Sequence, residues 1–229
     1  MAGLSNVEIY INSNKNVSST TATIYYYCDG TLPETDENIA GTRQYRYNTP
    51  SYSWTIKGIS TSRKSGSVSV SGLTQGAANT IRATVTLTCD RDKYVWDDEK
   101  GWWIYDSTST YTVDTETTTL TVYTRPGTFT KFSNITAGTT YISDILTAEN
   151  VTAWCNHCNK YLSWKNQTTS TAANSCKVNK NDFITATWYN KCAETCGIST
   201  RVSNDPTKSN SLITAECIKA LGTAISSYS

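Results

Sequence analysis

The sequence predicts an all-β domain followed by an all-α domain, namely a β-sandwich and then a small, disulfide-rich three-helix domain. Three observations lead to this prediction. Apolar residues alternate with polar ones along seven or more short stretches of the first 123 residues, a pattern typical of a sandwich. A phrase of two large apolar residues followed by Thr-Ala occurs three times in the last third. Six of the eight cysteines lie in that same third.

Length and charge narrow the classes of function. A chain of 229 residues suits one or two domains. A net charge of +1 gives no electrostatic basis for a nucleic acid or membrane partner. No apolar stretch has the length of a membrane-spanning helix, and residues 1–6 show no secretion signal. Only 17% of residues are charged, whereas Thr, Ser, Asn and Tyr are abundant, as on extracellular or virion proteins.

The first 124 residues are expected to form the sandwich domain. Its clearest strand is 80–89, where five apolar residues from Ile81 to Cys89 share one face. Residues 29–41 contain Gly, Pro and acids and are expected to form a loop. Thr49-Pro50-Ser51 is expected to be a turn between two strands. The expected strands, in order, lie near 7–11, 22–28, 45–47, 52–56, 68–70, 80–89, 103–105 and 111–123.

The segment Val70-Ser71-Gly72-Leu73-Thr74, leading into the strand 80–89, resembles the corresponding turn of fibronectin type III and related Ig-like domains. Trp54 lies where those domains place a core aromatic residue on the third strand. The resemblance implies an Ig-like sandwich. In that arrangement Cys28 and Cys89 would meet at one pole, either as an inter-sheet disulfide or as two buried thiols.

The same pole would carry the hairpin 90–103, which is rich in aromatic and acidic residues. Aromatic rings beside carboxylates can stack on a sugar or bury against a protein partner. The acids could instead hold calcium, although their spacing does not match an EF-hand loop. The tryptophans could also simply pack on their own domain. The candidate partner-contact residues are Tyr94, Trp96, Trp102 and Trp103.

After Pro126-Gly127, residues 125–144 are expected to be a connector that could add a strand at 139–142, and residues 145–229 a helical domain. Each repeated phrase places a Thr at a helix N-cap, at Thr147, Thr185 and Thr214. Positions +4, +7 and +11 from each Thr share one helical face and are expected to form a common core. These positions hold Val151, Trp154 and Cys158, then Tyr189, Cys192 and Cys196, then Ile218, Leu221 and Ile225.

The cysteines of the helical domain admit more than one interpretation. If the first two helices run antiparallel, Cys155 could pair with Cys196 and Cys158 with Cys192, which leaves Cys176 for Cys217. A zinc site built from Cys155, Cys158, Cys192 and Cys196 is the alternative, but zinc ligand pairs usually lie on turns. Free core thiols are a third possibility. A thioredoxin-like role would need a βαβ setting, which is missing here. His157, the single histidine, is expected to be a polar residue on its helix.

The sequence argues against an enzyme, and with disulfides preferred to the zinc alternative we expect no cofactor and no resident metal. The chain has one histidine and neither a GxSxG motif nor a phosphate-binding loop, and Asp97 and Asp98 are adjacent, which points them apart on a strand. A sandwich that ends in Tyr123-Thr124-Arg125-Pro126-Gly127-Thr128-Phe129, followed by repeated Ile-Thr-Ala helices, is similar to structural proteins of tailed bacteriophages of gut Firmicutes.

That resemblance implies a non-enzymatic virion protein, either a capsid decoration or head-fibre protein or part of a tail appendage. Its partners would be other capsid or tail proteins, contacted in multiple copies. It would be made in the host cytoplasm and oxidised after lysis releases it, which reconciles many cysteines with the missing signal. A carbohydrate- or receptor-binding adhesion module, contacting a host-surface glycan, is the alternative.

Overall fold

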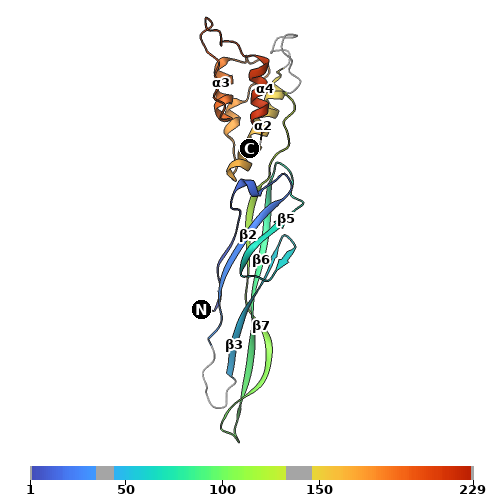
Figure 1. Ribbon diagram of the computed structural model, residues 1–229, viewed down its shortest axis with the longest axis vertical. Helices are drawn as coiled ribbons and strands as arrows, with labels where there is room; N and C mark the ends of the chain where they lie inside the picture. Colours follow the sequence, from blue (N-terminus) through green and yellow to red (C-terminus); the bar gives the residue numbers. More distant parts are fainter. Residues whose placement is uncertain (1, 35–43, 133–145, 228–229) are drawn as a thin grey trace. The chain divides into compact units, whose positions relative to one another are not determined.

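The computed structural model describes residues 2–34, 44–132 and 146–227 (Figure 1). The chain divides into two compact units. The β unit comprises Met1–Asn16, Thr21–Gly72 and Asn79–Val122, and the helical unit comprises Val17–Thr20, Leu73–Ala78 and Tyr123–Ser229. Two short segments from the first part of the chain therefore belong to the helical unit. Backbone hydrogen bonds explain this, because the amides of Thr124 and Arg125 donate to the carbonyls of Ala77 and Ser18 at 3.1 and 3.0 Å.

The β unit contains two antiparallel sheets in the part of the chain that is described. One sheet has the strand order β1-β2-β5 and the other β4-β3-β6-β7. The strands are β1 Gly3–Tyr10, β2 Ala22–Thr31, β3 Gln44–Ile56, β4 Ile59–Thr61, β5 Ser65–Val70, β6 Ala78–Asp97 and β7 Trp102–Tyr123, with a 3-10 turn η1 at Asn14–Asn16.

The sheets pack through the apolar residues that alternate along their strands. Between Ile81 and Cys89 every second residue of β6 is buried, as the sequence predicts. Tyr26 on β2 meets the fully buried Trp54 on β3 with ring centroids 5.1 Å apart, so the two sheets share a core. The tyrosine hydroxyl also hydrogen-bonds Thr61 at 2.9 Å.

Two strand predictions need correction. The expected pairs of strands at 45–47 and 52–56, and at 103–105 and 111–123, are single strands, β3 and β7. The register of β3 against β6 shifts between Asn48 and Ser51, and Thr49 has a positive φ of 45°. Pro50 lacks the amide that a ladder needs and is accommodated in this irregularity, so a bulge stands where we expected a turn.

The helical unit contains three α-helices and a short 3-10 helix among its described residues. They are α2 Ala148–Asn166, η2 Ala172–Cys176, α3 Ala186–Thr195 and α4 Ala215–Ala224. The three N-cap predictions are confirmed. The side chains of Thr147, Thr185 and Thr214 accept hydrogen bonds from the backbone amides three residues later, at 3.2, 3.1 and 3.3 Å. The predicted core face is confirmed too, because eight of its nine positions are buried and Cys196 is half-buried.

The three helices begin at one end of the unit and run in the same general direction. Residues that lie the same number of positions after their N-cap threonines contact one another. Trp154 and Leu221 each lie seven residues after an N-cap, and Trp154 Nε1 donates to the carbonyl of Leu221 at 3.1 Å. The sulfurs of Cys158 and Cys196, both at +11, are 4.0 Å apart. The antiparallel arrangement that we expected for α2 and α3 is therefore not present. The connection from 167 to 185 is long enough to return the chain to the starting end.

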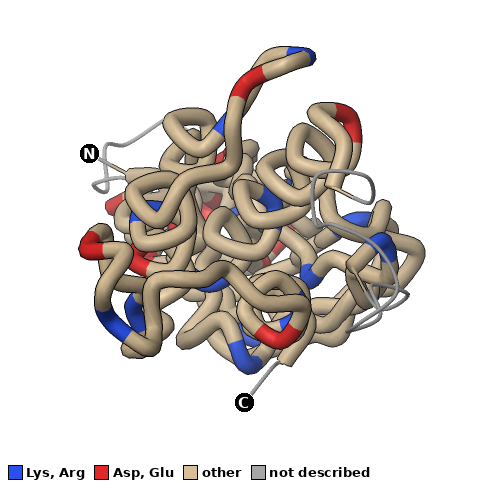
Figure 2. Tube along the Cα trace, turned by 90° about the horizontal axis from the view of Figure 1, so that it is seen from above, with Lys and Arg blue, Asp and Glu red and all other residues tan. Residues whose placement is uncertain are grey.

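Parts of three expected segments lie outside the described residues. These are residues 35–41 of the loop 29–41 and residues 133–144 of the connector, which include the strand expected at 139–142. No helix among the described residues is long and apolar enough to cross a membrane. Charged residues are scattered along the chain with both signs interspersed (Figure 2), in keeping with the net charge of +1.

Candidate functional site

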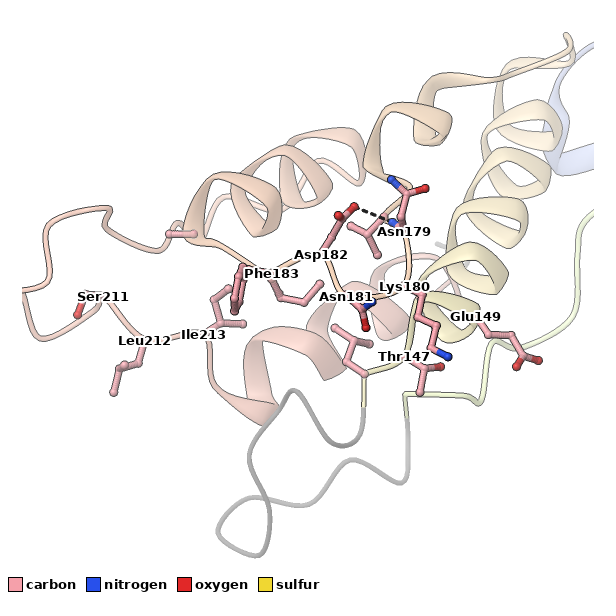
Figure 3. A pocket seen from close by; sticks show the side chains of 15 residues that line it. Thr147, Glu149, Asn179, Lys180, Asn181, Asp182, Phe183, Ser211, Leu212 and Ile213 are labelled. Carbon is pink, nitrogen blue, oxygen red and sulfur yellow. Dashed lines mark hydrogen bonds between the residues drawn. The ribbon is translucent and has the colours of Figure 1, made fainter.

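A cavity of about 1030 Å³ opens in the helical unit where the three repeated phrases come together (Figure 3). Each copy contributes to its wall, and we call it the helix-start pocket. Leu146 and Thr147 come from the first copy, Phe183 and Ile184 from the second, and Leu212 and Ile213 from the third. Because the helices run in the same direction, the short motif that begins each one is presented three times around one hollow.

Two apolar side chains of this pocket are exposed to an unusual degree. Phe183 is 89% exposed and Leu212 is 74% exposed, and each is the first apolar residue of its phrase. The second apolar residue, Ile184 or Ile213, is half-buried against the core of the unit. Figure 3 shows Leu212 projecting away from the helices. Before the N-caps Thr185 and Thr214, one apolar residue thus packs on its own unit while the other is exposed.

The rim of the pocket is polar and carries both signs of charge. Asp182 accepts a hydrogen bond from the backbone amide of Asn179 at 2.7 Å, which orders the turn before Phe183. Lys180 and Glu149 also line the pocket, and Glu149 lies 4.0 Å from Lys131. An apolar centre with a mixed polar rim is the usual composition of a protein-binding patch.

A second group of chemically notable residues lies in the core of the helical unit. Five cysteines gather between α2, η2 and α3, and we call them the thiol cluster: Cys155, Cys158, Cys176, Cys192 and Cys196. Four are fully buried and Cys196 is half-buried. The short helix η2 is held in place by the indole of Trp188, which donates to the carbonyl of Cys176 at 2.8 Å.

The thiols of the cluster differ in acidity because their neighbours differ. Interaction with the neighbouring Cys192 thiol lowers the pKa of Cys176 to about 6, and the same interaction raises the pKa of Cys192. The neighbouring Cys196 thiol and burial both raise the pKa of Cys158. Burial raises the pKa of Cys155 to about 12. Cys176 is consequently the thiol of this cluster that is most readily ionised at neutral pH.

The expected cysteine partners differ from those that the structure brings together. All eight cysteines lie in the described ranges and are free thiols. Cys158 is beside Cys196 and Cys176 is beside Cys192, in place of the pairs 155–196, 158–192 and 176–217. Cys217 instead contacts the hydroxyl of its own N-cap, Thr214, at 3.4 Å. No group of three or more His, Cys, Asp or Glu residues in the described ranges is arranged to hold a metal ion, so the zinc alternative gains no support.

Cys28 and Cys89 are both buried in the β unit, but they are not opposite one another. Cys28 lies beside Trp54, and Trp54 pairs with Val85 on the neighbouring strand. Cys89 is four residues further along β6 than Val85, or about 13 Å at the rise of a strand. The inter-sheet bridge implied by the Ig-like resemblance would therefore need a different strand register. Burial raises the pKa of Cys28 to about 11, so it behaves as an inert core thiol.

In the aromatic hairpin at the ends of β6 and β7, some aromatic side chains pack on one another and one is exposed. Trp96 and Trp103 pack edge to face with centroids 5.9 Å apart, and Tyr94 meets Tyr105 in the same manner at 6.0 Å. These pairs support the hairpin itself. Trp102 is different, because it is 59% exposed and free to contact a partner.

One acid of the hairpin turn, Asp97, is engaged within the turn itself. Asp97 accepts hydrogen bonds from the amides of Glu99 and Lys100, both at 3.0 Å, and forms an ion pair with the Lys100 side chain at 3.2 Å. These interactions hold the pKa of Asp97 below its usual value. The Asp97 carboxylate is therefore used to hold the turn, and contact of the hairpin with a partner stays a prediction.

The sequence pointed to the hairpin and the thiols but not to the helix-start pocket. The available signal was that two large apolar residues precede each N-cap, whereas a hydrophobic staple uses one.

Comparison of the chain with protein-family models, with curated proteins and with solved structures finds no match.

Proposed function

We propose that this protein is a non-enzymatic structural protein of a tailed bacteriophage particle, either a capsid decoration or head-fibre protein or part of a tail appendage. The observation that carries the proposal is the helix-start pocket. A domain that leaves Phe183 and Leu212 exposed beside an apolar hollow presents a docking surface, because such residues are costly to keep in water. The sequence resemblance in residues 123–129 and in the repeated phrases supplies the class of partner.

The occupant of the pocket is an apolar segment of another virion protein. The rim carries both signs of charge, and the chain as a whole has a net charge of +1, so long-range attraction to a highly charged ligand does not guide binding. Contact with the apolar centre then supplies most of the affinity. Repeated copies on a symmetric particle strengthen a weak single contact through multivalency.

The β unit is the candidate for the projecting part, and we propose that it is an Ig-like sandwich. Its strand order supports this. The first, second and fifth strands form one sheet, and the third, sixth and seventh belong to the other, as strands A, B, E and C, F, G do in Ig-like folds. The fourth strand is the short β4, which joins the sheet beside β3.

The test is incorporation into particles. Gradient-purified particles from a culture of the phage that encodes this chain are expected to contain the protein at a fixed copy number, measured by quantitative mass spectrometry. A Phe183→Asp, Leu212→Asp double variant, supplied in place of the wild type, is expected to be incorporated at least tenfold less. Ser209→Asp, an exposed position outside the pocket, is the matched control. Absence of the wild-type chain from particles would overturn the proposal, and equal incorporation of the double variant would exclude the pocket as the anchor.

A glycan-binding adhesion module is the second candidate, favoured by the exposed Trp102 beside the Trp96–Trp103 pair. A sugar ring could stack on this indole, as apolar sugar faces do on aromatic side chains. Glycan-array binding that is lost in Trp102→Ala and kept in Tyr10→Ala, an exposed aromatic residue elsewhere in the β unit, would support it. An array without signal for the wild type would count against it.

A further inference from the structure

We propose that the thiol cluster is an oxidation site in which two specific disulfides form, Cys158–Cys196 and Cys176–Cys192, while Cys155 and Cys217 remain thiols. The oxidant is a small external disulfide such as oxidised glutathione. This inference is independent of the proposed function, because it rests on the core of the helical unit and not on the helix-start pocket.

The geometry of the first pair follows from the direction of the helices. Cys158 on α2 and Cys196 at the C-cap of α3 both lie eleven residues after an N-cap threonine. Helices that run in the same direction from a common starting end bring such positions to the same level. Their sulfurs are 4.0 Å apart, and a disulfide needs about 2.05 Å. Small rotations of the two side chains can close this gap of about 2 Å.

The second pair is set by the position of η2. Cys176 ends this short helix, which packs on both α2 and α3. Its thiol neighbours that of Cys192 and contacts the hydroxyl of Thr195 at 3.8 Å. Two of its contacts therefore come from one turn of α3. Cys217 lies outside this group, on α4 beside Thr214.

The chemistry proceeds by two thiol–disulfide displacements for each bridge. In the first pair Cys196 is the accessible partner, because it alone is half-buried. Its thiolate attacks one sulfur of the external disulfide, forms a mixed disulfide and releases one glutathione thiolate. The Cys158 thiolate then attacks the Cys196 sulfur and expels the second glutathione thiolate. The protein loses two protons and two electrons, and one oxidised glutathione becomes two thiols.

The second pair undergoes the same two displacements, starting at Cys176. The low pKa of Cys176, about 6, makes its thiolate the majority form at pH 7.5. However, Cys176 and Cys192 are both fully buried, so the oxidant reaches them only when the unit opens locally. The Cys158–Cys196 bridge should consequently form first and the Cys176–Cys192 bridge more slowly.

Peptide mapping of the full-length chain tests this pairing. The reduced protein is treated with oxidised glutathione, its remaining thiols are alkylated in denaturant, and it is digested with trypsin. Three tryptic peptides should appear joined in one species: 132–160, 166–177 and 192–201. The peptide 209–219 should be free and alkylated at Cys217. The intact protein should carry four alkylated thiols and lose four protons relative to the reduced form.

Two variants distinguish Cys155 from Cys158, which share the peptide 132–160. Cys158→Ser should abolish the link between 132–160 and 192–201, whereas Cys155→Ser, the matched control, should keep it. The oxidised wild type should also unfold at a temperature about 10 °C or more above the reduced protein, because two long loops are closed. Eight alkylated thiols, or a link between 166–177 and 209–219, would overturn the proposal. So would a link kept in Cys158→Ser and lost in Cys155→Ser, a comparison that does not depend on either variant's stability.

Discussion

Replacing Trp154 with Phe should lower the free energy of unfolding of the helical unit by about 2–4 kcal/mol. Trp154 is fully buried, and its indole donates to the carbonyl of Leu221 at 3.1 Å. Leu221 is among the last four residues of α4, whose carbonyls have no intrahelical donor. The indole thus satisfies a group that α4 itself cannot.

The magnitude comes from two losses. Leaving a buried carbonyl without its donor costs about 1–3 kcal/mol. The smaller phenyl ring leaves a void of about 40 Å³, which at about 24 cal/mol per Å³ adds about 1 kcal/mol. Both losses affect the contact between α2 and α4. Trp154 and Leu221 lie equally far from the N-caps of these helices, so the experiment also tests whether the two helices run in the same direction.

The assay is a urea titration followed by circular dichroism at 222 nm, which reports the loss of α-helix. Trp102→Phe is the matched control, because this side chain is 59% exposed and the change should cost less than about 0.5 kcal/mol. If Trp154→Phe is as mild as the control, the indole–carbonyl bond does not hold α2 against α4, and the arrangement described here is wrong.

Other predictions concern the caps and the single histidine. Changing any one of the three N-cap threonines to Ala should cost about 1 kcal/mol in the same titration, and changing it to Ser should cost little, because the capping oxygen is kept. Burial lowers the pKa of His157, whose ring packs 5.4 Å from that of Phe129. The unfolded chain therefore takes up this proton first, so stability present above pH 6.5 should be lost as the pH falls below it. His157→Gln should show a smaller loss between pH 7.5 and 5.5, measured by thermal unfolding, and an unchanged loss would show that other groups are responsible.

The sequence predicted the helical elements well and their arrangement poorly. Each cap and each core face is encoded locally, within one turn or along one helix, so Thr185 and Tyr189 could be placed without knowing the fold. The direction of a helix relative to its neighbour is not encoded locally. It depends on the path of a connection of about twenty residues between α2 and α3. Because the direction of α3 differs from the one we expected, the cysteines that lie side by side differ too.

The β unit shows the same division between local and distant information. Alternation located the strands, because inward and outward residues have a period of two. Pro50 was interpreted as part of a turn, since its missing amide disrupts a ladder, yet a bulge accommodates the same residue inside β3. The helix-start pocket could not be predicted, because Phe183 and Leu212 come together only through the shared starting end of the helices.

The common direction of the three helices also has a kinetic consequence. In an up-and-down bundle, neighbouring helices meet across a short loop and most contacts are local. Here Trp154 meets a residue 67 positions away, and Cys158 meets one 38 positions away. A chain must close such long loops before its contacts stabilise it, and folding slows as the sequence separation of contacts grows. The helical unit should thus fold more slowly than an up-and-down bundle of equal size and helix content.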